Sequence, residues 1–350
     1  MQLQSVENFS GFSHLAFCKL GADNEFHDVV VVKANLRLDN GPLEVIPEPA
    51  EIHLADHYAN PNAPTYSVIT RAGDAVVHKP ATDVLVTGHA IAPHGEPHAE
   101  WLCEFGVETR VGTRVKRLHL TGTRDWQWSG MRGWVLSAPD KIDRLPLTYA
   151  LAYGGHDTAN RMRYDPNPAG CGWFGKRTLS RSERYPAPQI QYVDDPVRAM
   201  DTPIGVAGLG PMARWWAGRY RYAGTYDDVW KAEFHASQHS IYPKDFDARF
   251  FLCAHPDWRF DPYLLGDESF WLAGFHAESG IRAQLPGIGI EGACLTKAGT
   301  LLVAPLAMDT LHIDLDQKTV SLTWRVSLPQ SLGITQLALR GMYVKEFEKG

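Results

Sequence analysis

The stretch Thr319-Val-Ser-Leu-Thr-Trp-Arg-Val-Ser-Leu328 decides the fold class, because polar and apolar residues alternate through it without a break. Its apolar members are Val320, Leu322, Trp324, Val326 and Leu328. Successive side chains of a β-strand point to opposite faces of the sheet, so this period of two predicts a strand. Leu311, Ile313 and Leu315 alternate in the same way just upstream, and the polar residues 316–318 predict a turn between the two runs. We therefore expect a β-hairpin here.

The first half of the chain repeats this signal. Four consecutive valines at positions 29–32 lead into an alternation with apolar Ala34, Leu36 and Leu38, and Asn40-Gly41-Pro42 ends the predicted strand. A second hairpin is predicted from about residue 105 to residue 120, with its turn at Gly112-Thr113.

Only one segment has the period of a helix. Its apolar residues are spaced i, i+3, i+4 and i+8, and they are Tyr226, Val229, Trp230 and Phe234. Thr225 is the predicted N-cap, with Asp228 three residues later. The helix is therefore expected to be short.

These patterns predict a mainly β protein of two packed antiparallel β lobes, sandwich-like, with long Pro/Gly-rich loops and few short helices. One domain is expected to span residues 1–350. Its N-terminal lobe covers about residues 20–155 and its C-terminal lobe about residues 225–345. Between the lobes, periodicity fades into proline and glycine punctuation from about residue 156 to residue 224. A long irregular stretch in a compact domain is often functional.

Charge and hydropathy narrow the classes of partner. The chain has 34 Lys and Arg against 40 Asp and Glu, a formal net charge of −6. A nucleic-acid binder usually carries a basic excess, so nucleic acid is not expected as a partner. No apolar run approaches the ~20 residues of a membrane span, and the first residues lack a basic stretch followed by an apolar one. We expect a soluble, cytoplasmic protein without a membrane partner.

One glycine pattern is a candidate cofactor site, and one histidine cluster is a candidate metal site. Gly287-Ile-Gly-Ile-Glu-Gly292 has the spacing of a dinucleotide-binding turn. Leu285-Pro286 before it and Lys297-Ala-Gly299 after it indicate a loop instead. His89, His94 and His98 do not share a helical face, because Pro93, Gly95 and Pro97 lie among them. The five cysteines contain no Cys-x-x-Cys pair. No metal and no cofactor are therefore expected.

Acidic residues supply the only other candidates for catalysis, since paired carboxylates can perform acid/base chemistry. Asp227 and Asp228 fall in the first turn of the predicted helix, where negative charge is stabilising. The remaining candidates lie in turn-like stretches, and they are Asp245, Asp247, Asp267 and Glu268. No residue is predicted to be catalytic, and the chain is not expected to be an enzyme.

One segment interleaves basic and aromatic residues. Its members are Arg214, Trp215, Trp216, Arg219, Tyr220, Arg221 and Tyr222, followed by Tyr226 and Trp230. Arg, Trp and Tyr are enriched at the hot spots of protein interfaces. We interpret the segment as a partner-binding surface whose partner is another protein. The alternative is that its aromatic rings pack in the core with the arginines at the rim.

Several stretches, in this order, resemble one bacterial family. They are Val30-Val-Val-Lys-Ala34, Lys79-Pro-Ala-Thr-Asp-Val-Leu-Val-Thr-Gly-His89, Ala92-Pro-His-Gly95, Gly122-Thr-Arg-Asp-Trp126, Pro146-Leu-Thr-Tyr149, Tyr153-Gly-Gly155, Asn167-Pro-Ala-Gly170, Gly210-Pro211 with Trp215 and Arg219, Gly224-Thr-Tyr-Asp227 with Trp230, Pro243-Lys-Asp-Phe-Asp247, Leu265-Gly-Asp-Glu268 and Leu322-Thr-Trp-Arg325. The chain resembles the adaptor (chaperone) family encoded beside VgrG spikes and PAAR or PAAR-like effectors of the type VI secretion system.

This resemblance implies a non-enzymatic adaptor that binds a secreted effector, at or near its PAAR-like region, and promotes its loading on the VgrG spike. A second hypothesis from a different class is a carbohydrate-active β protein that uses carboxylate pairs and exposed tryptophans. A spike or effector gene nearby would favour the adaptor, and a sugar-dependent change in tryptophan fluorescence would favour the carbohydrate protein.

Overall fold

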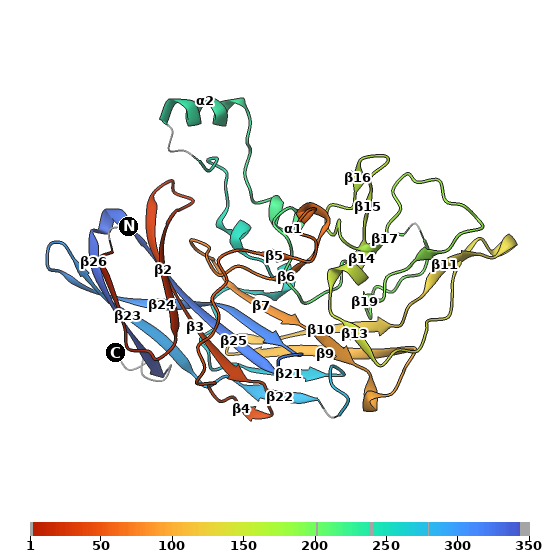
Figure 1. The fold of residues 1–350 in the computed structure, drawn as a ribbon, viewed down its shortest axis with the longest axis horizontal. Helices are drawn as coiled ribbons and strands as arrows, with labels where there is room; N and C mark the ends of the chain where they lie inside the picture. Colours follow the sequence, from red (N-terminus) through yellow and green to blue (C-terminus); the bar gives the residue numbers. More distant parts are fainter. Residues whose placement is uncertain (1–2, 201, 238–240, 279, 344–350) are drawn as a thin grey trace.

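The computed structural model describes residues 3–200, 202–237, 241–278 and 280–343, and most of its regular structure is β (Figure 1). Two large sheets and several small ones make up the body. Within the described residues, the α-helices are the four-residue α1 (Ala217–Tyr220) and the ten-residue α2 (Asp228–Ser237). The prediction of a mainly β protein with few short helices is confirmed.

The strands of the nine-stranded sheet are β1 (Ser5–Asn8), β2 (Ser13–Leu20), β3 (Phe26–Arg37), β7 (Thr82–Thr87), β20 (Arg259–Phe260), β23 (Ile288–Thr296), β24 (Leu301–Asp314), β25 (Thr319–Pro329) and β26 (Ile334–Tyr343). The six-stranded sheet consists of β4 (Gly41–Pro42), β9 (Glu100–Thr109), β10 (Gly112–Thr121), β19 (Ile190–Tyr192), β21 (Ser269–Ala273) and β22 (Ile281–Gln284).

The smaller sheets contain β5 (His57–Tyr58) with β6 (Ile69–Arg71), β8 (His89–Ile91) with β13 (Arg144–Pro146), β11 (Asp125–Trp128) with β12 (Trp134–Leu136) and β18 (Tyr185–Pro186), β14 (Tyr153–Gly154) with β17 (Cys171–Gly172), and β15 (His156–Asp157) with β16 (Met162–Arg163). The 3₁₀ helices are η1 (Pro64–Tyr66), η2 (Pro93–Gly95), η3 (Gly130–Arg132), η4 (Tyr149–Leu151), η5 (Ala248–Phe251), η6 (Pro256–Trp258) and η7 (Gln330–Leu332).

The predicted hairpin of residues 311–328 is present as β24 and β25, which pair antiparallel with Leu311 opposite Leu322. The hairpin does not stay within the C-terminal part of the chain. β25 pairs antiparallel with β3, and β24 pairs in parallel with β7. The six-stranded sheet likewise joins β9 to β21. Both large sheets therefore mix strands from the predicted lobes 20–155 and 225–345, and sheet membership does not follow that division.

The valine run of β3 is buried on both faces of its sheet. Val30 and Val32 belong to the main core, which continues between the two large sheets. Val29 and Val31 face a second cluster that includes Phe251, with Tyr242, Phe246 and Phe250 packed against it. Burial on both faces explains why apolar residues are consecutive here instead of alternating.

A buried ion pair joins distant parts of the chain. Lys79 and Asp83 lie 2.9 Å apart, and both side chains are inaccessible to solvent. Asp83 also accepts hydrogen bonds from the backbone N–H groups of Cys253 and Ala254. Burial alone would raise the pKa of Asp83, but Lys79 and these N–H groups hold it below its usual range. The carboxylate therefore stays charged and fastens residues 253–254 to β7.

Two local predictions from the sequence were wrong. The pattern Gly287–Gly292, expected in a loop, lies largely in β23, between β24 and β26. The proline and glycine residues around it mark the ends of a strand rather than a loop. The hairpin of β9 and β10 turns at Arg110 and Val111, two residues before the expected Gly112-Thr113, because Gly112 already pairs with Thr109.

In the part of the chain that the structure describes, no helix has the length and apolar character needed to cross a membrane.

Candidate functional site

An arm formed by residues 225–237 and 241–245 leaves the body and carries α2 at its tip, well away from the sheets (Figure 1). The two chain segments that connect the arm to the body are joined by hydrogen bonds at its base. The carboxylate of Asp245 accepts hydrogen bonds from the backbone N–H and the hydroxyl of Thr225, at 2.9 and 2.7 Å. Just below, the backbone N–H of Asp247 donates to the carbonyl of Tyr222. The arm is therefore anchored at a defined point.

The helix of the arm begins later than the sequence predicts. α2 starts at Asp228, and the side chain of Asp227 accepts a hydrogen bond from the backbone N–H of Trp230 at 2.9 Å. Asp227 thus caps the helix. The predicted cap, Thr225, is instead bonded to Asp245 across the arm.

Aromatic rings form a row along α2. The ring of Trp230 lies 4.7 Å from that of Tyr226 and 5.4 Å from that of Phe234, measured between centroids. Trp230 and Phe234 are four residues apart in α2 and share one face of the helix, and Tyr226, just before the helix, continues the row. Tyr226 is exposed, and Val229 beside it is 65% exposed. The arm therefore presents aromatic and aliphatic surface to solvent.

The structure divides the predicted segment 214–222 into exposed and buried residues. Trp215 is 41% exposed, and Arg214, Tyr220 and Arg221 are also at the surface. These four lie at the foot of the arm, and we call them, with Tyr226, Trp230 and Phe234, the arm surface. Arg221 lies over the ring of Tyr222, with 4.8 Å from its guanidinium carbon to the ring centroid.

Two members of the predicted set cannot contact a partner in this structure. Trp216 is fully buried and packs edge-on against Tyr149. Arg219 is 4% exposed, and its guanidinium donates hydrogen bonds to the carbonyls of Phe250 and Met212. Arg219 is therefore buried, and backbone carbonyls satisfy its charge inside the protein. The alternative interpretation, in which the aromatic rings of the segment pack in the core, holds for Trp216 and not for Trp215.

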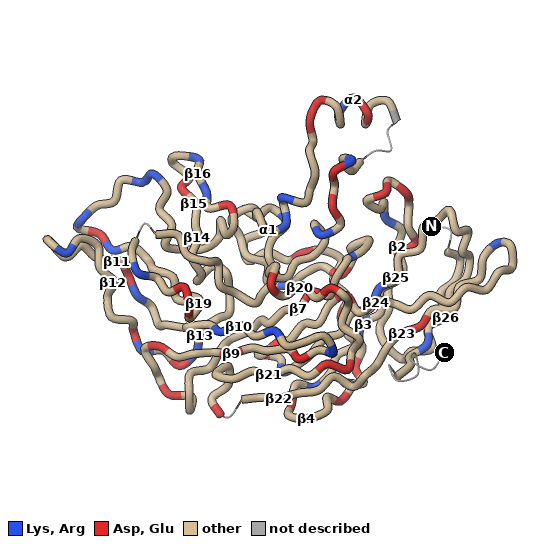
Figure 2. The backbone as a smooth tube through the Cα atoms, turned by 180° about the vertical axis from the view of Figure 1, so that it is seen from behind, with Lys and Arg blue, Asp and Glu red and all other residues tan. Residues whose placement is uncertain are grey.

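Acidic and basic residues are spread over the whole molecule, and the arm carries both signs (Figure 2). On α2, Lys231 is paired with Asp228 at 2.8 Å. At the foot of the arm, Arg214 is paired with Asp56 at 3.2 Å. The arm surface therefore combines exposed rings with mixed charge, rather than a single strongly charged patch.

The other candidate residues are bound within the fold. The carboxylates of Asp247 and Asp267 pair with Arg249 and Arg110. Glu268 accepts hydrogen bonds from two backbone N–H groups, those of Leu265 and Gly266. His89 pairs with Asp316, and His98 bonds the carbonyl of Glu96. Across the described residues, no three His, Cys, Asp or Glu side chains are grouped closely enough to hold a metal ion.

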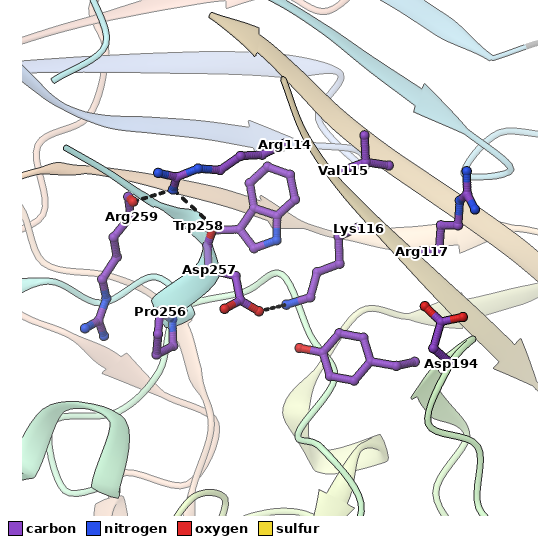
Figure 3. Close-up of a pocket in the computed structure, with 10 residues that line it drawn as sticks. Arg114, Val115, Lys116, Arg117, Asp194, Pro256, Asp257, Trp258 and Arg259 are labelled. Atoms are coloured by element: carbon purple, nitrogen blue, oxygen red, sulfur yellow. Dashed lines mark hydrogen bonds and ion pairs between the residues drawn. The ribbon is translucent and has the colours of Figure 1, made fainter. Parts of the chain in front are cut away.

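A pocket that was not predicted from the sequence lies between β10 and residues 256–259 (Figure 3). Its volume is about 750 Å³. Lys116 of β10 enters it, with its side chain only 4% exposed. The ammonium points toward the carboxylate of Asp257, whose nearer oxygen is 4.0 Å away (Figure 3). It also lies over the ring of Tyr192, 4.9 Å from the centroid.

One signal in the sequence marks Lys116. It has the same parity in β10 as Leu118 and Leu120, both of which are buried. A lysine at an inward-facing position of a strand is unusual, because burial of its charge is costly. The pocket also adjoins the foot of the arm, since Arg259 in its wall donates a hydrogen bond to the carbonyl of Gly218 in α1.

Comparison with known proteins identifies one family. The model of the family described as "Uncharacterized protein conserved in bacteria (DUF2169)" matches residues 23–325, which is most of the chain. The match covers the six-stranded sheet, the arm, the pocket and the nine-stranded sheet except β1, β2, β26 and the end of β25. No curated protein and no solved structure matches the chain significantly.

Proposed function

The chain belongs to DUF2169, a family of uncharacterized proteins conserved in bacteria, and from this premise we propose that it is a non-enzymatic adaptor of type VI secretion. In this proposal it binds a secreted effector through the PAAR-like region and promotes the loading of that effector on the VgrG spike. The resemblance of the sequence stretches described above is the reason for naming this secretion system.

The observation that carries the adaptor proposal is the arm. It holds a row of aromatic rings away from the body, on a base fixed by hydrogen bonds. Exposed aromatic and Arg side chains are the types that dominate protein interfaces energetically. The display of such residues on a projecting helix favours contact with another large molecule. We propose that the effector covers the arm surface.

The test is capture of a defined effector by variants of the arm surface. The protein is co-expressed with a PAAR-like effector protein of type VI secretion, and the affinity of the purified pair is measured. One variant carries Tyr226→Ala, Trp230→Ala and Phe234→Ala, and a second carries Arg214→Ala and Arg221→Ala. Truncation of interface hot spots costs about 2 kcal/mol or more, so we expect Kd to rise at least ~30-fold in the first variant.

The matched control carries Phe9→Ala and Arg132→Ala, since both residues are exposed and lie outside the arm. Its affinity should equal that of the parent, and all variants should keep the melting temperature of the parent. Assembly of the complex with VgrG is then followed by size-exclusion chromatography. Equal capture by the parent and the first variant, or failure of the parent to bind the PAAR-like protein, would contradict the proposal.

A further inference from the structure

The ammonium group of Lys116 has more hydrogen-bond donors than acceptors. It donates to the carbonyl of Gly208 at 3.1 Å, and Asp257 at 4.0 Å lies beyond hydrogen-bond distance. An ammonium carries three N–H donors. Two of them therefore lack an acceptor among the described residues. Burial of a charged group with unmade hydrogen bonds is costly, so this arrangement needs a reason.

The three arginines of the pocket already donate hydrogen bonds within the protein. Arg114 donates to the carbonyls of Asp257 and Arg259 and lies over the ring of Phe260. Arg259 donates to the carbonyls of Ala254 and Gly218. Arg117 is bonded to Glu104 at 2.8 Å.

The carboxylate that faces Lys116, that of Asp257, has a second partner. Asp257 also pairs with His255, 3.2 Å from the ring nitrogen to the nearer carboxylate oxygen. The pocket is lined by four basic residues, Lys116 among them, and by two acidic ones, Asp194 and Asp257. In a chain with a net charge of −6, this is a local excess of positive charge. It favours entry of an anion.

We propose that the pocket binds a ligand through a carboxylate group. This carboxylate accepts hydrogen bonds from the two N–H groups of Lys116 that do not bond to Gly208. A carboxylate carries one negative charge and two acceptor oxygens, which match one ammonium. A doubly charged phosphate is disfavoured, because Asp257 lies 4.0 Å from the same ammonium and would repel the second charge. The carboxylate comes either from a small organic acid or from an acidic side chain of a protein. This inference does not rest on the proposed adaptor function.

The pH dependence of binding follows from the surroundings of Lys116. Burial lowers the pKa of its ammonium to about 7. The pKa of Tyr192 is raised and that of His255 is lowered by burial, so both groups stay neutral near pH 7. A hydrogen bond from His255 lowers the pKa of Asp257, which stays ionised. Between pH 6 and pH 8.5 Lys116 therefore loses its charge, and binding is stronger at pH 6.

The experiment uses isothermal titration calorimetry on the full chain, with two carboxylate probes. Butyrate represents a small acid with one negative charge, and the peptide acetyl-Ala-Glu-Ala-amide represents a protein side chain. Butyramide and acetyl-Ala-Gln-Ala-amide are the neutral counterparts. We expect at least one acid to bind, at least ten times more tightly than its amide, and more tightly at pH 6 than at pH 8.5. The probe with the higher affinity identifies the source of the carboxylate.

Two variants and a control complete the test. Lys116→Met should lower the affinity at least tenfold, and Lys116→Arg, charged at every pH, should bind with little change between pH 6 and pH 8.5. Lys141→Met is the control, because Lys141 is exposed and does not line the pocket. Absence of binding by both acids, equal binding of an acid and its amide, or full affinity in Lys116→Met would overturn the proposal. The comparison of acids with amides requires no variant to fold.

Discussion

Trp215 and Trp216 are neighbours in the chain with opposite environments, and they make a matched pair for mutation. Trp216→Ala removes a fully buried ring that packs against Tyr149, and should cost about 3–5 kcal/mol of the free energy of unfolding. Trp215→Ala removes a half-exposed ring and should cost less than about 1 kcal/mol. Urea unfolding followed by circular dichroism measures both. Equal losses of unfolding free energy in the two variants would contradict the burial of Trp216 and the exposure of Trp215.

The sequence suggests residues 214–222 as a candidate surface, but it does not show which of their side chains face outward. The spacing of Trp215, Trp216 and Arg219 has no clear period, so no face is defined. Arg219 is buried because carbonyls of Met212 and Phe250 accept hydrogen bonds from its guanidinium, and Phe250 lies in η5, further along the chain. Lys116 was overlooked because its environment depends on residues 208 and 257, far along the chain.

At the scale of elements, a close approach between β9 and β21 can be tested. Gly106 lies opposite Trp271, and a Cβ on Gly106 would meet the indole ring at 2.1 Å. Gly106→Val should therefore displace the ring and cost about 1–3 kcal/mol. With Trp271→Ala in the same chain the clash disappears, so the two losses should not add. Thermal unfolding of the single and double variants measures this. Full additivity would mean that the ring does not cover Gly106.

Elements with an unbroken period were predictable from sequence, and their ends were less so. β24 and β25 follow the alternation of residues 311–328 closely. The helix of the arm was found by its apolar spacing, yet its cap was misplaced, because both Thr225 and Asp227 can accept the capping hydrogen bond. The glycines of β23 obscured a strand, since glycine usually weakens one.

For the whole molecule, the mixed sheets predict that the chain folds as one unit. Deletion of residues 301–350 removes β24, β25 and β26, so that β3 loses its neighbour β25 and keeps only β2, while β7 loses β24 and keeps only β20. We expect this variant to show no cooperative thermal transition. Replacement of residues 226–241 by a short Gly/Ser linker removes only the arm and should preserve the transition. A cooperative transition in the shortened chain would show that the first 300 residues are a domain of their own.

The position of β3 has a consequence for protein synthesis in the cell. One edge of β3 can pair with β2 soon after translation. The other edge pairs with β25, which leaves the ribosome hundreds of residues later. At ~5–20 residues per second, the delay is on the order of tens of seconds. During this time an unpaired apolar strand edge is available to other nascent chains. Production of soluble protein should therefore depend on a holding chaperone at the ribosome exit, and slower translation should lower the soluble yield.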